Sequence, residues 1–184
     1  MAFAIRTPRL LLREWRAEDT EAFDQMSANP KVMEFLAPFA DRASIDAYIA
    51  VARDHWQVHG FGKFTVELPG EAAFIGMIGL DQVRAALPFA PAIEAVWRLA
   101  PAYWARGYAL EAARAAIDDG FGRLDLAEIV AYTTDDNWRS RRVMERLGMI
   151  HNATEDFDFV HARSPRGCPP RRCVLYRLRR KDLQ

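Results

Sequence analysis

Residues 93–121 read IEAVWRLAPAYWARGYALEAARAAIDDGF, and this stretch predicts a strand, a tight turn and a helix. Residues 93–99 are rich in β-formers, which favours a strand, and Pro101 ends it because proline cannot continue a sheet ladder. The alanine-rich residues 110–121 have the periodicity of a helix packed on a sheet. Gly107 lies between the two elements, where the lack of a Cβ lets backbone N–H groups approach a ligand. Because these groups lie at the positive end of the helix dipole, the turn predicts an anion site suited to phosphate.

A second informative stretch, residues 136–149, reads DNWRSRRVMERLGM and predicts a capped amphipathic helix. Asn137 is a strong N-cap residue. Val143, Met144 and Leu147 recur at helical spacing and supply an apolar face. Gly148 follows as a C-terminal cap, so the helix is expected over residues 137–147.

Together the two stretches resemble the acyl-CoA signature of the GNAT acyltransferases. In that family a Gln/Arg-x-x-Gly-x-Gly/Ala turn wraps the pyrophosphate of acetyl-CoA, and here the frame is residues 104–109, with Trp104 in place of Gln or Arg. The family's last helix opens with Asn-x-x-Ser/Ala and closes with Lys/Arg-Leu-Gly-Phe/Met, as residues 137–149 do. Two motifs in order are more specific than either alone. Residues 7–13, 103–109 and 171–178 resemble the ribosomal-protein N-acetyltransferase (Rim-type) branch.

The resemblance implies acetyl-CoA as co-substrate and no metal. The residues expected to contact the cofactor lie on the strand, in the turn and at the start of the last helix: Trp97, Arg98 and Leu99 through backbone N–H groups, then Trp104, Ala105, Arg106, Gly107, Tyr108, Ala109, Asn137 and Ser140. The side chains of Trp97 and Leu99 share a strand face and are predicted to pack in the core. For Arg106 a solvated side chain, and for Gly107 an ordinary loop glycine, stay open as alternatives.

The implied chemistry is attack of an amine on a thioester, which needs a base for the amine and an acid for the leaving thiolate. Glu94 matches the Glu of the family's Glu-Ile-Gly-Trp-Arg-Leu strand and is the candidate base, with a solvent-facing or ion-paired carboxylate as the alternative. Many GNAT enzymes carry a Tyr acid in the last helix, where this chain has Met144. In Rim-type members a Ser at the start of that helix is thought to act instead. Ser140 occupies that place, with local hydrogen bonding as its alternative role.

The periodicity predicts a chain of alternating strands and helices. Strands are expected over residues 9–15, 61–68, 74–83, 93–99, 128–134, 149–160 and 172–180, and helices over 19–27, 32–36, 44–59, 110–121 and 137–147, with Ser44 as the cap of the third. This order matches the GNAT fold, which is α+β (mixed α/β) with a mixed, mostly antiparallel sheet of about six to seven strands flanked by helices.

Composition bounds the remaining properties. The 184 residues are 51% hydrophobic and fit one domain over residues 1–184. Lys+Arg and Asp+Glu both count 25, so no net charge points to a nucleic acid or an anionic membrane as partner. With no signal peptide and no long apolar run, a cytoplasmic protein is expected. Cys168 and Cys173 are therefore predicted to be free thiols, and neither is presented as a nucleophile.

The sequence thus predicts an acetyl-CoA-dependent N-acetyltransferase that acts by direct attack in a ternary complex. The acceptor is a primary amine, either a protein N-terminus or a small molecule. An N-terminal amine, with a pKa of about 7.7–8.0, is easier to use near neutral pH than a lysine at about 10.4. Two alternatives stay open: a non-catalytic acyl-CoA-binding or sensor module, which Met144 supports, and an unrelated α/β interaction domain. The oligomeric state is not fixed, with a homodimer among the options.

Overall fold

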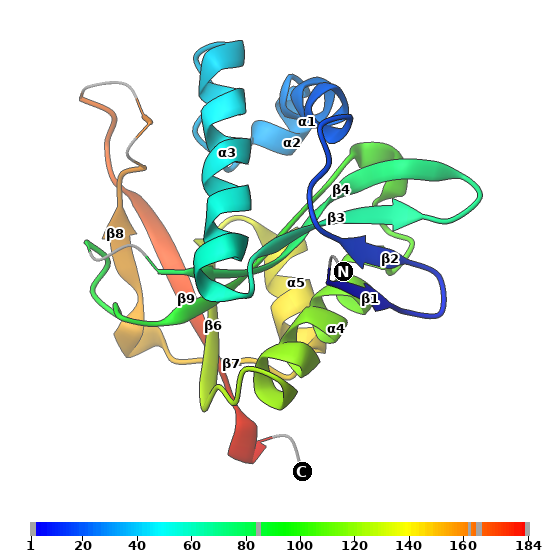
Figure 1. Ribbon diagram of the computed structural model, residues 1–184. Coiled ribbons are helices and arrows are strands. Elements are labelled where there is room, and N and C mark those ends of the chain that lie inside the picture. Colours follow the sequence, from blue (N-terminus) through cyan, green and yellow to red (C-terminus); the bar gives the residue numbers. More distant parts are fainter. Residues whose placement is uncertain (1–2, 84–85, 162, 165–166, 183–184) are drawn as a thin grey trace.

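The computed structural model describes residues 3–83, 86–161, 163–164 and 167–182 and shows one mixed sheet with helices on both faces (Figure 1). The sheet has nine strands in the order β1-β2-β3-β4-β5-β6-β9-β7, and β8 also pairs with β9. All paired neighbours are antiparallel except β5 and β6, which are parallel. The mixed, mostly antiparallel fold is confirmed, and the sheet is larger than the predicted six to seven strands.

The elements follow one another along the chain as predicted in outline. The strands are β1 (Ala4–Arg6), β2 (Leu11–Arg13), β3 (Lys63–Leu68), β4 (Ala72–Gln82), β5 (Ile93–Leu99), β6 (Glu128–Thr134), β7 (Ile150–His151), β8 (Phe157–Phe159) and β9 (Arg171–Arg179). The helices are α1 (Asp19–Ser27), α2 (Pro30–Met33), α3 (Arg42–His59), α4 (Tyr108–Gly122) and α5 (Trp138–Arg146).

The additional strands are short. β1 has three residues, too few for an alternating pattern to be visible in the sequence. The single strand predicted over residues 149–160 is wrong, because the chain leaves the sheet in its middle. There the side chain of Asn152 accepts a hydrogen bond from the Thr154 N–H (3.2 Å) and caps a 3-10 helix, Ala153–Glu155. The two ends, β7 and β8, each pair with β9.

Helix α3 begins one turn earlier than predicted. Its N-cap is Asp41, whose carboxylate accepts from the Ser44 N–H (2.8 Å), while Ser44 Oγ accepts from the Asp41 N–H (3.2 Å). Ser44 is therefore the N3 member of a reciprocal capping box and not the cap itself. The helix ends where expected, at Gly60 in the left-handed conformation (φ 69°).

The two faces of the sheet carry different helices (Figure 1). α1 and α3 pack on the face that presents Met77 of β4 and Val96 of β5. α4 packs on the opposite face through Ala112 and its other small residues, against Ile78 and Ala95. Since side chains alternate along a strand, the even-numbered residues of β5 face α1 and α3 and the odd-numbered residues face α4. This division decides which residues of β5 meet which part of the site.

A buried ion pair joins the start of the chain to the sheet. Arg13 and Asp19 are 5% and 3% exposed, and they form two parallel hydrogen bonds, both of 2.8 Å. Asp19 also accepts from the Arg16 N–H (2.7 Å) and from Thr65 Oγ1 (3.1 Å). Burial raises the pKa of the Asp19 carboxyl, but the Arg13 hydrogen bonds and those of its other donors outweigh it and hold the pKa below the ordinary value.

Asp19→Asn is expected to lower the free energy of unfolding by about 3–5 kcal/mol, because it leaves a buried guanidinium without its main counter-charge. Since the folded-state pKa of Asp19 is lowered from 3.8, the contribution of the pair is fully present above that pH and is lost as pH falls below it, through the lowered folded-state pKa. The wild-type advantage over the variant, measured by urea unfolding, should thus be large at pH 7 and shrink near pH 3. Asp46→Asn, which breaks an exposed pair with Arg42 (3.0 Å), is the control and should change little; equal losses in both would contradict the assignment.

Candidate active site

The sheet opens between β5 and β6. β5 pairs with β4 along its whole length, from Gly76↔Leu99 to Gln82↔Ile93. Its register with β6, among the residues that the structure describes, has one pair, Glu94↔Val130. The later residues of β5 therefore have a sheet neighbour on one side only, and a gap widens between the two strands toward the end of β5.

The main-chain groups of β5 divide between β4 and this gap. The Ala100 N–H donates to Ile75 O on the β4 side (2.9 Å), and opposed residues in an antiparallel ladder alternate between bonded and non-bonded pairs. Trp97 and Leu99 thus fall on non-bonded pairs, so their N–H and C=O groups point into the gap. Arg98 falls on a bonded pair, so its N–H is directed to β4. A backbone contact with a cofactor fits Trp97 and Leu99, whereas Arg98 presents only its side chain.

The turn after β5 is tied to the strand and has an unusual backbone. Trp104 Nε1 donates to Leu99 O (2.7 Å). Ala105 has φ 58° and Gly107 has φ 82°, so two residues of the turn are in the left-handed region, which costs an alanine about 1–2 kcal/mol. Gly107 is the N-cap of α4, and a Cβ built there would meet, within 4 Å, only Arg9 Nη2 at 3.3 Å. The first N–H groups of an α-helix have no partner within the helix, so the start of α4, beside the guanidinium of Arg9, fits a phosphate group.

Two residues that sequence reasoning missed brace this turn from the start of the chain. Arg9 Nη1 donates to Arg106 O (3.0 Å), and Arg9 Nε donates to Glu111 Oε2 (2.7 Å). Thr7 Oγ1 donates to the other oxygen of Glu111 (2.7 Å). Burial raises the pKa of Glu111, but the hydrogen bonds from Thr7 and Arg9 outweigh it and lower the pKa below its ordinary value. Arg106 itself is exposed, and only its carbonyl oxygen has this described role.

The start of α5 lies on the β6 side of the gap. Asn137 caps the helix as predicted: its Oδ1 accepts from the Ser140 N–H (3.2 Å), and its Nδ2 donates to Thr133 Oγ1 of β6 (2.9 Å). Ser140 is partly exposed in the first turn. Met144, at the position where many relatives of this motif carry Tyr, is 1% exposed and packs in the core. The Asn137 side chain and the Ser140 hydroxyl are thus held together at the N-terminal end of α5.

Glu94 lies on the face of β5 that α1 and α3 cover. It is paired in register with Asp81 of β4, and Asp81 forms an ion pair with Lys63. Burial lowers the pKa of Lys63, but the charges of Tyr48, Asp81 and Glu94 together outweigh it and raise the pKa above its ordinary value. Glu94 is thus close enough to a buried ammonium for their charges to interact. Both open readings, a base and an ion-paired carboxylate, are compatible with this position.

The side chains of Trp97 and Leu99 point the other way, toward α4. Leu99 is 6% exposed and Trp97 is partly buried against the same core cluster. The predicted core packing of these two side chains is confirmed. The side chains of Trp97 and Leu99 therefore pack in the core, whereas their main-chain N–H and C=O groups point into the gap between β5 and β6.

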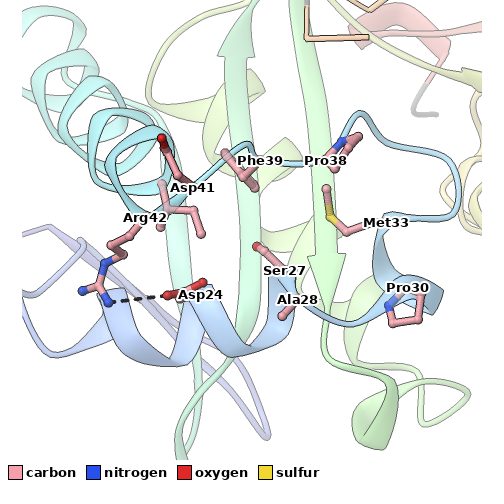
Figure 2. Close-up of a pocket in the computed structure, with 10 residues that line it drawn as sticks. Asp24, Ser27, Ala28, Pro30, Met33, Pro38, Phe39, Asp41 and Arg42 are labelled. Carbon is pink, nitrogen blue, oxygen red and sulfur yellow. Dashed lines mark hydrogen bonds and ion pairs between the residues drawn. The ribbon is translucent and has the colours of Figure 1, made fainter. Parts of the chain in front are cut away.

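A surface hollow of about 540 Å³ lies apart from these residues, between α1, α2 and the start of α3 (Figure 2). Its lining is Asp24, Ser27, Ala28, Pro30, Met33, Pro38, Phe39, Asp41, Arg42 and Ile45. Asp24 and Arg42 form an ion pair at its rim (3.5 Å). None of the predicted site residues lines the hollow, so it is not the anion site of the turn.

Within the described ranges, no group of three or more His, Cys, Asp or Glu side chains is placed to hold a metal ion. No helix of the described chain is long and apolar enough to cross a membrane. Cys168 and Cys173 are free thiols as predicted, the first exposed and the second buried. Burial raises the pKa of Cys173 to about 11, so this thiol stays protonated at neutral pH.

Comparisons with known proteins agree with this geometry. The model of the Acetyltransferase (GNAT) domain family matches residues 9–150. The uncharacterized N-acetyltransferase YnaD of Bacillus subtilis is 32% identical over 145 residues, 79% of this chain and 81% of that protein. The FsC-acetyl coenzyme A-N(2)-transacetylase of Aspergillus fumigatus is 30% identical over 161 residues, 82% of this chain and 66% of that protein. The crystal structure of a GNAT-family acetyltransferase from Bacillus anthracis superposes with a TM-score of 0.77 at 25% identity, covering 96% of this chain and 98% of that one.

Proposed function

This chain belongs to the GNAT acetyltransferase family and is an acyltransferase, and from that premise we propose that it transfers the acetyl group of acetyl-CoA to a primary amine. Transfer is direct, within a ternary complex. Cys173 is unsuited as an acyl carrier, since it is buried with a raised pKa, and Cys168 stands in no motif that would present and activate it as a nucleophile. A reducing, cytoplasmic compartment suits the two free thiols.

The gap between β5 and β6, next to the start of α4, is the observation that carries this proposal. The turn at residues 104–109 supplies N–H groups and a helix dipole for the pyrophosphate, with Arg106 at its exposed side. The main-chain groups of Trp97 and Leu99 in the gap bind the amide-containing arm and the acetyl carbonyl. Asn137 and Ser140 are expected on the opposite side of the same gap, because α5 follows β6 in the chain and Asn137 Nδ2 donates to Thr133 Oγ1 of β6 (2.9 Å).

The proposed chemistry divides between the two sides of the gap. Glu94 removes the proton from the attacking amine, directly or through water, at a position whose charge interacts with that of Lys63. The leaving thiolate takes a proton from Ser140, since Met144 has none to give. The acceptor is a protein N-terminal amine or a small amine. The Rim-type motif and the lower pKa of α-amines favour the N-terminal amine.

Ser140→Ala is expected to lower kcat by about 100-fold, the lower limit of the range for a general acid, because serine is a weak one. The KM for acetyl-CoA should change little, since the backbone N–H that Asn137 binds is retained. Ser140→Thr keeps a hydroxyl and should restore part of the rate. Steady-state kinetics by thiol release measures all three; a variant with wild-type kcat would remove Ser140 from the mechanism.

The deciding experiment is a screen of acceptors with acetyl-CoA, read by thiol release. It uses peptides with free and blocked N-termini and a set of small amines, each with and without protein. Transfer to free but not blocked amines supports the proposal. Binding of CoA, detected as a rise in melting temperature, without transfer to any acceptor would instead support the non-catalytic module that Met144 suggests.

A further inference from the structure

Arg98 as a whole is half-buried, and part of its guanidinium is buried without a hydrogen-bond partner among the described residues. Its Nε and Nη1 atoms are fully covered, and among the described residues neither has an acceptor. The guanidinium lies near two aromatic rings, with Cζ 5.6 Å from the ring centroid of Phe23 and 6.0 Å from that of Tyr48. Burial lowers the pKa of Arg98, with the charge of Tyr48 opposing it. A guanidinium nevertheless stays charged in proteins, so the two buried nitrogen atoms of this cation face aromatic rings and no acceptor among the described residues.

Arg13 is a buried arginine of the same chain whose guanidinium has hydrogen-bond acceptors. Its guanidinium donates to both oxygens of Asp19 (2.8 Å each), to Glu67 (3.0 Å) and to Ala73 O (2.8 Å). Buried charges in proteins are normally paired in this way, because an unpaired one loses its hydration without compensation. The buried ammonium Lys63, on the same face as Arg98, also has a partner, Asp81. Arg98 therefore departs from the pattern of its own protein.

The position of Arg98 indicates where its partner comes from. It lies on the face of β5 that α1 and α3 cover, as does Glu94 four residues earlier. The start of α4, where the cofactor phosphates are placed, belongs to the opposite face. A strand rises about 3.3 Å per residue, so the two backbone positions are about 13 Å apart. A molecule that presents its amine near Glu94 would reach Arg98 with a group several bonds away.

We propose that Arg98 determines specificity by binding a carboxylate that the amine acceptor carries several bonds from its amine. This rests on the proposed acetyl transfer at the gap between β5 and β6. A carboxylate matches the planar donor fork of a guanidinium through two parallel hydrogen bonds. It supplies the acceptor oxygens that the protein lacks at this position. The carboxylate comes either from an acidic side chain near the N-terminus of a peptide or from a small amino acid.

The surface hollow is not the route to Arg98. Phe39 lines the hollow (Figure 2) and also contacts Phe23 and Tyr48, with centroids 5.7 and 5.5 Å apart, so the rings around Arg98 border it. The hollow, however, is lined by two carboxylates, Asp24 and Asp41, against one cation, Arg42, so its net charge disfavours an anion. The acceptor therefore approaches from the side of the gap, where its amine is needed.

Matched acid and amide acceptors test the proposal. One arm uses peptides that differ only in Asp against Asn, or Glu against Gln, at the second and third residues. The other arm uses 5-aminopentanoate against its amide. In at least one arm the wild-type enzyme should prefer the acid by 10-fold or more in kcat/KM, and the arm that responds identifies the source of the carboxylate. Arg98→Met should reduce this acid-to-amide ratio by at least 10-fold, and Arg98→Lys should retain part of it.

Arg98→Met keeps the length of the side chain and removes a cation with two buried, unpaired nitrogen atoms, so its stability to urea should equal or exceed that of the wild type. Arg53→Met, an exposed arginine of α3, controls for the loss of a positive charge and should keep the wild-type ratio. Equal transfer to acid and amide by the wild type, or equal loss of both in Arg98→Met, would overturn the proposal. If the wild type transfers to no acceptor, the proposed function fails. The role of Arg98 is then decided by calorimetry with CoA present, which compares the affinity for each acid with that for its amide in the wild type and in Arg98→Met.

Discussion

Gly107→Glu is expected to abolish CoA binding. The substitution places a carboxylate at the N-cap of α4, next to the N–H groups that have no partner within the helix, so the charge repels the pyrophosphate and the side chain fills its site. The residue also has φ 82°, which only glycine adopts without strain. We expect a loss of affinity of at least about 100-fold, or about 2.8 kcal/mol at 1.4 kcal/mol per tenfold. The measurement is the shift in melting temperature with CoA, supported by calorimetry.

Gly70→Glu is the matched control. Gly70 has φ 81° in the turn between β3 and β4, and a Cβ there would meet nothing within 4 Å. It therefore carries the same backbone strain and the same added charge, far from the start of α4. Gly107→Ala separates the strain from the charge and should bind CoA more weakly than the wild type but better than Gly107→Glu. Wild-type affinity in a folded Gly107→Glu protein would exclude the turn as the phosphate site.

Glu94→Gln is expected to lower kcat by about 10²- to 10⁴-fold, the range for removal of a general base. The loss should be greatest at low pH, where most of the amine is protonated, and shrink as pH rises, because the free amine and hydroxide then replace the missing base. The affinity for CoA should be retained, since Glu94 points to the face opposite α4. The pH dependence of kcat/KM, compared between variant and wild type, measures the effect.

Asp81→Asn, the corresponding acid-to-amide change at the neighbouring carboxylate, distinguishes a catalytic role of Glu94 from a role in balancing the charge of Lys63. Asp81 opposes Glu94 in the sheet and forms the ion pair with Lys63. If Glu94 acts only by balancing that ammonium, Asp81→Asn should reduce turnover as much as Glu94→Gln does. If Glu94 is the base, Asp81→Asn should have the smaller effect and keep the shape of the wild-type pH profile.

Local signals in the sequence were sufficient for most of the fold. The alternation of residues 93–99, the alanine spacing of α4 and the Asn137 cap each report on neighbours a few residues away, and the structure confirms all three. The prediction failed where a local signal was ambiguous. Both Asp41 and Ser44 are good capping residues, and the apolar ends of residues 149–160 hid the break at Asn152. β1 is too short to leave a pattern.

The site depends on contacts that no local pattern contains. Arg9 and Glu111 are 102 residues apart, and nothing in either stretch indicates that they meet. The gap between β5 and β6 follows from how two strands diverge in space, which neither strand encodes alone. Arg98 was expected to act through its backbone, and only the register with β4 shows that its N–H points away from the gap. The roles of Glu94 and Ser140, and the single-domain organisation, stay predictions.

The division of β5 between its main chain and its two faces has an evolutionary consequence. If the arm of the cofactor is held by the N–H and C=O groups of Trp97 and Leu99, recognition of the common cofactor does not depend on which side chains stand there. Mutations at these positions are then constrained by core packing alone. Recognition of the acceptor lies in even-numbered side chains such as Arg98, which can change one at a time without disturbing the cofactor. A strand built this way lets a lineage exchange acceptors while the donor stays fixed.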